Sequence, residues 1–190
     1  MVLLGMRNLA RREQAKQLLA WGAARVWGLD PLPQLAVGER GKPWFPACPQ
    51  YQFNLSHSGT LALCVLADRP VGVDIQEVRE TWRPSLVTRT CTPEERAWLA
   101  SRGDRREDFA QLWALKESGG KQTGYGLPYP PSRQPVPLPP LGEPYDPEKI
   151  YPLGQVQFRV YLGDTWRGAV CALDAPPRAI QWVDNLLEKN

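Results

Sequence analysis

The middle of the chain alternates hydrophobic and polar positions with the period of a β-strand. Residues 52–58 alternate in this way and lead into a polar turn, whereas residues 61–67 form a continuous apolar run that is typical of a strand covered on both faces. Residues 71–76 return to period two, which places Asp74 and Gln76 on the face opposite the valines. An aspartate among apolar strand residues is unfavourable unless it is paired, hydrogen-bonded or bound to a metal. Asp74 is therefore a candidate site residue.

Apolar residues with helical spacing predict three helices. A long helix is expected over residues 8–29, where a glycine closes it. A second helix is expected to open at Thr92, a capping residue that precedes a proline and two acids. The third begins near Phe109, with Asp108 as its cap, and ends at the glycine pair that starts with Gly124.

The last third of the chain begins with a proline-rich segment. Residues 128–147 contain nine prolines, so we expect an extended, semi-rigid loop that folds over a site, meets a partner or merely connects. Residues 156–162 alternate cleanly, and with a second strand at residues 166–173 they predict a hairpin across Gly163 and Asp164. Residues 180–187 are expected to form a short closing element.

Composition and charge narrow the class of protein. The 190 residues are enough for one or two domains, and 43% hydrophobic and 23% charged residues are ordinary globular usage. The net charge of +3 comes without a polybasic block, which argues against a nucleic-acid partner and fits an anionic ligand or an acidic protein. No apolar run is long enough to cross a membrane, and the four cysteines form no CxxC pair. We therefore expect a cytoplasmic monomer without a membrane partner.

The third helix carries candidate chemistry. Trp113, Glu117 and Lys121 are spaced four apart and should form one column on its surface. A carboxylate one turn from an ammonium group suits a site that holds a divalent cation beside phosphate. The alternative is an ordinary surface pair worth a few tenths of a kcal/mol, so the helix alone does not decide between them.

Two further stretches could contact an anionic ligand. Gly41, Lys42 and Pro43 form a turn in which the glycine permits a close backbone approach, although any turn could have this composition. His57, the single histidine, stands between two serines at a strand end, where it could contact an anion or be structural.

Taken together, these stretches resemble the 4′-phosphopantetheinyl transferase superfamily, in particular the surfactin-synthetase-activating type. Four signatures occur in the order of the family, and the WxxKE(S/A)xxK pattern with a trailing GxGL is the most specific. The signatures are Gly41-Lys42-Pro43, Asn54-Leu55-Ser56-His57-Ser58, Gly72-Val73-Asp74, and WALKESGGK from Trp113 to Lys121 followed by Gly124-Tyr125-Gly126-Leu127.

The resemblance implies a fold and an activity. Such enzymes are α+β pseudo-dimers of two similar α+β halves, which we place at residues 1–72 and 73–190, with coenzyme A between them. They move phosphopantetheine from coenzyme A to a serine of an apo acyl or peptidyl carrier protein and yield the holo carrier. The alternatives are a non-catalytic homologue that binds the carrier protein or coenzyme A, and a metal-dependent phosphoesterase unrelated to carriers.

The resemblance also implies site residues. Asp74 and Glu117 match the magnesium ligands, and Gln76 stands where many members have a further acid, so water is expected to fill that coordination position. Lys121 matches the lysine on the pyrophosphate. Glu117, directly or through a metal-bound water, is the expected general base, with His57 as the second candidate.

The expected coenzyme A contacts are spread over the first half of the chain. The nucleotide phosphates would meet Ser56 and His57, and the adenine would lie beside the Gly-Lys-Pro turn. Only residues 1–8 precede the first expected helix, where this type has a longer segment with a strand, so contacts from that segment to the 3′-phosphate are expected to be missing. The residues that match the family's coenzyme A contacts are Arg11, Gly41, Lys42, Pro43, Ser56, His57 and Lys121.

Overall fold

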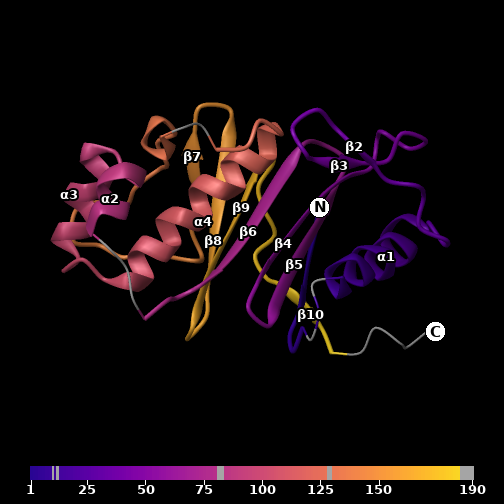
Figure 1. Ribbon diagram of the computed structural model, residues 1–190, viewed down its shortest axis with the longest axis horizontal. Helices are drawn as coiled ribbons and strands as arrows, with labels where there is room; N and C mark the ends of the chain where they lie inside the picture. Colours follow the sequence, from indigo (N-terminus) through magenta and orange to yellow (C-terminus); the bar gives the residue numbers. More distant parts are fainter. Residues whose placement is uncertain (10, 12, 81–83, 128–129, 185–190) are drawn as a thin grey trace.

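The computed structural model describes residues 1–9, 11, 13–80, 84–127 and 130–184, and it confirms the α+β class. Figure 1 shows two sheets side by side, with strand orders β10-β1-β5-β4 and β6-β9-β8-β7. The strands of the first sheet are β1 (Val2–Met6), β4 (Gln52–Ser58), β5 (Leu61–Ala67) and β10 (Gln181–Val183). Those of the second sheet are β6 (Val71–Glu77), β7 (Tyr151–Leu153), β8 (Val156–Leu162) and β9 (Trp166–Ala172).

Each sheet has one long helix against it. In Figure 1, α1 (Gln14–Trp27) lies on the first sheet and α4 (Arg106–Thr123) crosses the second. Among the described residues, none of the helices is long and apolar enough to cross a membrane. The shorter elements are α2 (Pro84–Thr90), α3 (Pro93–Ser101), the 3-10 turn η1 (Pro131–Arg133), and the small hairpin of β2 (Ala36–Val37) and β3 (Pro43–Trp44).

Three apolar cores hold these layers together. Leu18 of α1 belongs to the core under the first sheet, and Leu112 of α4 belongs to the core under the second. A third core joins the remaining faces of the two sheets, with Leu63 of β5 against Val73 of β6 and Val170 of β9. Both faces of β5 are therefore covered, as its continuous apolar run predicted.

The first helix begins later than predicted. It was expected from residue 8, but α1 starts at Gln14 and ends at Gly28, whose φ of 68° closes it. Asn8 has a φ of 58°, and the amide of Leu9 donates to the carbonyl of Thr60 at 2.8 Å. This contact holds residues 8 and 9 against the β4–β5 turn, so they leave the helical pattern.

Two elements were not predicted. No element was assigned to residues 1–8, but β1 forms there and pairs antiparallel with β5 and parallel with β10. The helix expected to open at Thr92 is α3, and α2, the helix before it, was not predicted. The closing element appears as β10, and residues 185–187 of that expectation lie outside the described residues.

The cap of α4 also differs from the prediction. Asp108 was expected to cap this helix, but the N-cap is Arg105 and Asp108 lies in the first helical turn. There its carboxylate accepts a hydrogen bond from Nε of Arg102 at 3.2 Å. An acid in the first turn still favours the positive end of the helix dipole.

The division into halves at residues 72 and 73 stays a prediction, as does the pseudo-dimer. β6 spans that boundary and belongs wholly to the second sheet. β10, which follows the second sheet in the chain, returns to pair with β1. The chain therefore crosses between the sheets twice.

Side chains of β4 join the two sheets. β4 and β6 are edge strands of different sheets, and backbone amides of β6 donate to side-chain oxygens of β4 instead of to its backbone. These bonds run from Val73 to Oδ1 of Asn54 (3.0 Å), from Ile75 to Oγ of Ser56 (3.3 Å) and from Glu77 to Oγ of Ser58 (3.0 Å). Residues two apart on a strand share a face, so one face of β4 supplies the whole junction.

α4 approaches β6 closely at Gly72. A Cβ atom on Gly72 would lie 2.0 Å from the carbonyl oxygen of Ser118 and 2.4 Å from the amide nitrogen of Gln122. Both are backbone atoms of a helix and cannot yield to a side chain. The glycine of the Gly-Val-Asp motif thus allows α4 to lie directly over the strand that carries Asp74.

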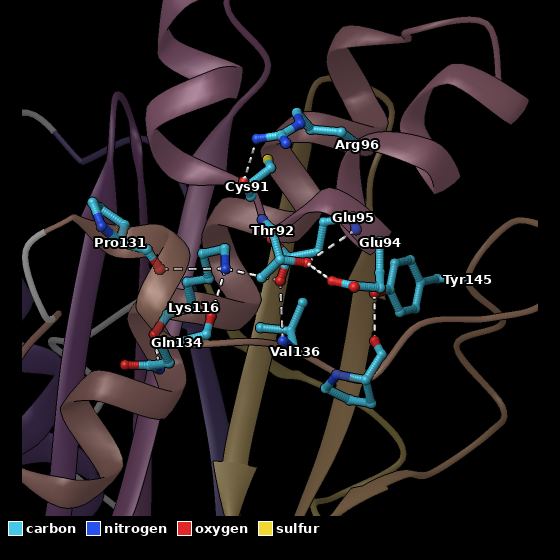
Figure 2. A network of polar contacts seen from close by, with 11 residues as sticks. Cys91, Thr92, Glu94, Glu95, Arg96, Lys116, Pro131, Gln134, Val136 and Tyr145 are labelled. Atoms are coloured by element: carbon cyan, nitrogen blue, oxygen red, sulfur yellow. Dashed lines mark hydrogen bonds and ion pairs between the residues drawn. The ribbon is translucent and has the colours of Figure 1, made fainter.

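The lysine before Glu117 is fully buried. Lys116 is 0% exposed, and its ammonium group donates to Oε1 of Glu95 on α3 at 2.8 Å. The same ammonium donates to the carbonyls of Pro131 and Gln134, as Figure 2 shows. All three N–H groups of the lysine are therefore used inside the protein.

Glu95 connects the proline-rich segment to α3. Its Oε2 accepts the amide of Thr92 at 2.8 Å, which completes a capping box at the start of α3, where the sequence predicted only that Thr92 caps the helix. Its Oε1 also accepts the amide of Val136 at 3.1 Å. Val136 and Tyr145 are buried. The described part of the proline-rich segment is therefore anchored to α3 and α4 at Gln134, Val136 and Tyr145, whereas residues 140–144 are exposed.

Replacing Lys116 with methionine is expected to lower the free energy of unfolding by about 3–5 kcal/mol, because the Glu95 carboxylate would remain buried without its counter-charge. The control is Lys149→Met, which removes an exposed pair with Asp146 at 3.9 Å. That change should cost less than about 1 kcal/mol. Urea unfolding followed by tryptophan fluorescence measures both values. Equal losses in the two variants would contradict the prediction.

Candidate functional site

Asp74 lies at the point where β4, β6 and α4 meet. It is 5% exposed, and its Oδ1 accepts hydrogen bonds from Nζ of Lys121 at 2.6 Å and from the hydroxyl of Ser56 at 2.7 Å. The Lys121 ammonium also donates to Oγ of Ser56 at 3.2 Å. Three predicted site residues from three elements thus form one closed triangle.

Glu117 adds a second carboxylate to this triangle. It precedes Lys121 by one turn of α4 and is half-buried. Burial raises the pKa of Glu117, the Lys121 ammonium opposes the rise, and the negative charge of Asp74 adds to it. Trp113 lies one turn before Glu117 on α4, so the helix places the three residues in the column predicted from the sequence.

The other oxygen of Asp74 has no hydrogen-bond partner. Within the described residues, Oδ2 is buried and makes no hydrogen bond. Burial raises the pKa of Asp74, and the interactions with Lys121 and Ser56 oppose this rise. A buried acceptor without a partner costs about 1–3 kcal/mol, so the site favours a ligand that can satisfy Oδ2.

These groups fit a divalent cation. Two carboxylates share one lysine here, and a cation beside them would relieve their mutual repulsion. Mg²⁺ is commonly held by one or two carboxylates, with substrate phosphates and water completing its coordination. No cluster of three or more His, Cys, Asp or Glu side chains occurs in the part of the chain that the structure describes. The protein would therefore offer Asp74 and Glu117.

Gln76 lies on the same strand face as Asp74, two residues further along β6. Its Nε2 donates to the carbonyl of Glu77 at 3.2 Å. The Glu77 carboxylate contacts the β4–β5 turn, where its Oε1 accepts the amide of Thr60 at 3.4 Å. The role of Gln76 at the metal stays a prediction.

A large cavity opens beside this group. Its volume is about 1010 Å³, and Gln76 and Trp113 both line it, which connects it to β6 and to the α4 column. The rest of the lining combines three cationic side chains with apolar ones, together with the acidic Glu77 and the polar Ser85. Its cations are Arg79, Arg89 and Arg106, and its apolar side chains include Leu86, Phe109 and Ala110. An anionic partner with an apolar surface would suit it.

Lys42 contacts the backbone of the second sheet and its helix. Gly41 and Pro43 flank it in the β2–β3 hairpin, and burial lowers the pKa of Lys42. Its ammonium donates to three carbonyls, those of Lys121 (2.8 Å), Val71 (3.1 Å) and Gln122 (3.2 Å). The predicted place of this turn beside adenine stays a prediction, but the ammonium itself lies against protein.

His57 and Arg11 are not part of the triangle of Asp74, Ser56 and Lys121. His57 follows Ser56 on β4, and because neighbouring strand residues point to opposite faces, it shares the face of Phe53 and Leu55. Arg11 is exposed in the turn before α1, where its backbone amide donates to Oε1 of Gln14 at 3.0 Å. Their roles toward coenzyme A stay predictions.

Three residues that support the site were not identified from the sequence. Asn54 and Ser58 lie two residues to either side of Ser56 along the strand. Three small polar residues on one strand face were therefore the sequence signal for this junction. Lys116 follows the buried Leu112 by one helical turn, which was a signal for a buried lysine.

Comparisons with known proteins point to one family. The family model described as "4'-phosphopantetheinyl transferase superfamily" matches residues 70–171. A 4'-phosphopantetheinyl transferase from Bacillus subtilis is 39% identical over 116 residues, which cover 60% of this chain and 51% of that protein. The transferase AcpT from Salmonella typhi is 37% identical over 124 residues, covering 61% and 64% respectively. The transferase Sfp from Bacillus subtilis is 37% identical over 98 residues, covering 51% and 44%.

The chain thus spans about half to two thirds of the length of these curated relatives. The family match runs from the residue before β6 into β9 and includes α4. It therefore contains the strand and the helix that bring Asp74, Glu117 and Lys121 together. Since the match also covers more than half of the chain, the chain belongs to the 4′-phosphopantetheinyl transferase superfamily.

Proposed function

We propose that this chain transfers the 4′-phosphopantetheine group from coenzyme A to a serine of an apo acyl or peptidyl carrier protein, and that the transfer depends on Mg²⁺. The observation that carries the proposal is the pair of Asp74 and Glu117, with a partnerless buried oxygen on Asp74 and with Lys121 on its other oxygen. The relatives named above support it, because each is itself a 4'-phosphopantetheinyl transferase.

Lys121 is placed to bind the diphosphate of coenzyme A. An ammonium group has three N–H donors, and those of Lys121 include one to Asp74 and one to Ser56. The third donor can bind a phosphate oxygen. Breaking the phosphoanhydride bond places negative charge on the leaving oxygen, and a fixed ammonium beside it stabilises that charge. Mg²⁺ held by Asp74 and Glu117 would supply further charge neutralisation on the same diphosphate.

Glu117 is the proposed general base. In the transfer, the serine oxygen of the carrier forms a bond to phosphorus, the bond to the leaving adenosine 3′,5′-bisphosphate breaks, and the serine proton passes to a carboxylate. Burial raises the pKa of Glu117, which makes it a better proton acceptor than an exposed glutamate. His57 lies on the other face of β4 from Ser56, which favours Glu117 over His57 for this step.

The arginine-lined cavity is the proposed approach for the carrier protein. Arg79, Arg89 and Arg106 surround it, and Trp113 connects it to the turn of α4 that carries Glu117. A carrier with acidic side chains around its serine would be attracted to this rim, and its apolar side chains would meet the floor. Its approach through this cavity would bring the serine toward Glu117.

The deciding experiment mixes the protein with coenzyme A, Mg²⁺ and apo carrier proteins from fatty acid, polyketide and nonribosomal peptide systems. Mass spectrometry of each carrier should show the gain of one phosphopantetheine group. No gain on any carrier, together with binding of coenzyme A, would instead support a non-catalytic homologue. Hydrolysis of coenzyme A without a carrier would support a phosphoesterase.

Glu117→Gln should keep the fold and the affinity for coenzyme A but lower kcat for transfer by at least about 100-fold, because the amide cannot accept the serine proton. Circular dichroism, coenzyme A binding by calorimetry and the carrier mass assay test the three parts. Glu107→Gln, in the first turn of the same helix, is the control and should keep full activity. Full activity in Glu117→Gln would remove this residue from the base and metal roles.

Gln76→Glu should bring a third carboxylate to the face of Asp74 and strengthen Mg²⁺ binding, since Mg²⁺ prefers charged oxygen ligands. The Mg²⁺ concentration that gives half of the maximal transfer rate should fall by roughly tenfold. Gln52→Glu at the start of β4, where the side chain is half-buried and its Nε2 donates to the carbonyl of Pro49, is the control, with no expected effect. An unchanged magnesium titration would show that position 76 does not face the metal.

Arg89→Glu should lower kcat/KM for the carrier protein roughly tenfold, and the loss should shrink at high salt, because the reversed charge repels an acidic carrier. The KM for coenzyme A should not change. Arg25→Glu on α1, which lies against the other sheet, is the control and should have little effect. A salt-independent loss, or a loss in both variants, would argue against docking at this cavity.

A further inference from the structure

The β2–β3 turn presents Lys42 in a fixed direction. The amide of Gly38 donates to the carbonyl of Lys42 at 2.9 Å, and the amide of Gly41 donates to the carbonyl of Gly38 at 2.9 Å. Gly41 has a φ of 86°, a conformation that side chains rarely tolerate. The turn is therefore closed by its own hydrogen bonds, and the Lys42 side chain leaves it toward the second sheet.

The Lys42 ammonium group binds at the C-terminal end of α4. The last four carbonyls of a helix lack their usual partners one turn further along the helix, and those of Lys121 and Gln122 are among them. The carbonyl of Lys121 also accepts the amide of Gly124, the C-cap, at 3.3 Å. Lys42 donates to the carbonyls of both Lys121 and Gln122, and a cation there also interacts favourably with the helix dipole. Lys42 thus caps α4 from another part of the chain.

The same ammonium reaches the start of β6. Its third hydrogen bond goes to the carbonyl of Val71, three residues before Asp74 on the strand. A lysine has three N–H groups, so the ammonium is saturated by backbone acceptors and has no donor left for a ligand phosphate. One side chain therefore joins the strand that carries Asp74 to the helix that carries Lys121.

Two neighbouring contacts show that the hairpin is fitted to this helix end. A Cβ atom on Gly124, the C-cap of α4, would lie 3.4 Å from Cδ of Lys42, an ordinary contact distance, so the lysine stem packs beside this helix end. The guanidinium of Arg40 stacks over the ring of Tyr125 at 4.3 Å. Figure 1 shows the hairpin of β2 and β3 beside the C-terminal end of α4.

We propose that Lys42 is a positioning residue, which holds the last turn of α4 to the start of β6 and so keeps Lys121 against Asp74. The kinetic consequence rests on the proposed transferase function: Lys42 should govern kcat rather than the affinity for coenzyme A. A lysine that bound the adenine or a phosphate of coenzyme A directly would do the reverse. The two roles are therefore separable by measurement.

Lys42→Met keeps the stem and removes the three donors, so the last turn of α4 should open more often. Hydrogen exchange followed by mass spectrometry should show roughly tenfold faster exchange in peptides covering residues 120–126, while peptides covering residues 109–115 stay unchanged. Lys16→Met, which removes an exposed lysine from α1, is the control and should leave both regions unchanged. Unchanged exchange at residues 120–126 in Lys42→Met would overturn the proposal.

The kinetic part compares the same variants in the carrier assay. Lys42→Met should lower kcat by at least about tenfold and change KM for coenzyme A by less than about threefold, since a small misplacement of Lys121 affects the transition state more than binding. A raised KM with normal kcat would overturn the proposal in favour of a direct coenzyme A contact. If the wild-type chain transfers nothing, the proposed function fails while the exchange measurement still decides the role of Lys42.

A second variant covers the case in which Lys42→Met does not fold. Lys42→Gln keeps two N–H donors without the charge, so it should retain part of the cap and give intermediate exchange at residues 120–126. Exchange equal to that of the wild type in Lys42→Gln would count against the cap. Faster exchange confined to those residues would support it.

Discussion

The two sheets are held in register by side-chain oxygens on one strand edge. Asn54, Ser56 and Ser58 of β4 accept backbone amides of β6, so small polar side chains replace the ladder that would otherwise join neighbouring strands. Such side chains extend the reach of β4, and the gap they bridge is where α4 and Asp74 meet. Ser56 takes part in both functions, since its oxygen accepts the amide of Ile75 and the ammonium of Lys121 while its hydroxyl donates to Asp74. The junction between the sheets and the candidate site are therefore one hydrogen-bonded structure.

α4 is fixed over this junction at three positions along its length. Between Ser118 and Gln122, in the C-terminal third of the helix, the absence of a side chain on Gly72 brings α4 onto β6. One turn away, buried Lys116 joins the helix to α3 and to the proline-rich segment. At its end, Lys42 caps it from the first half of the chain. Lys116 and Glu117 are neighbours in sequence, and because successive helical residues point in different directions, one is buried in the protein while the other faces the site. Fixing the first side chain therefore fixes the direction of the second.

The sequence predicted what depends on local periodicity and could not predict what depends on distant contacts. The strands at 52–58 and 61–67 were found because alternation and burial leave a direct pattern. The start of α1 was wrong because Leu9 bonds to Thr60 on another turn, which no spacing of apolar residues records. The strand β1 was missed for a similar reason, since it becomes a strand by pairing with β5 and β10. The convergence of Asp74 and Lys121 came from the family resemblance, whereas the acceptor role of Asn54 came only from the structure.

The candidate site is energetically unfavourable by itself, and the rest of the fold stabilises it. Burying a carboxylate oxygen without a partner, beside a second carboxylate, is unfavourable, and Lys121 compensates only one of the two oxygens of Asp74. Such an arrangement persists when the surroundings over-determine it, as the β4 junction and the three contacts of α4 do here. A less constrained chain could relax by turning Asp74 toward water or by moving Glu117 away. Asp74 cannot turn toward water without losing its contacts with Lys121 and Ser56, so its negative charge remains available for a cation and for the phosphates that would accompany it.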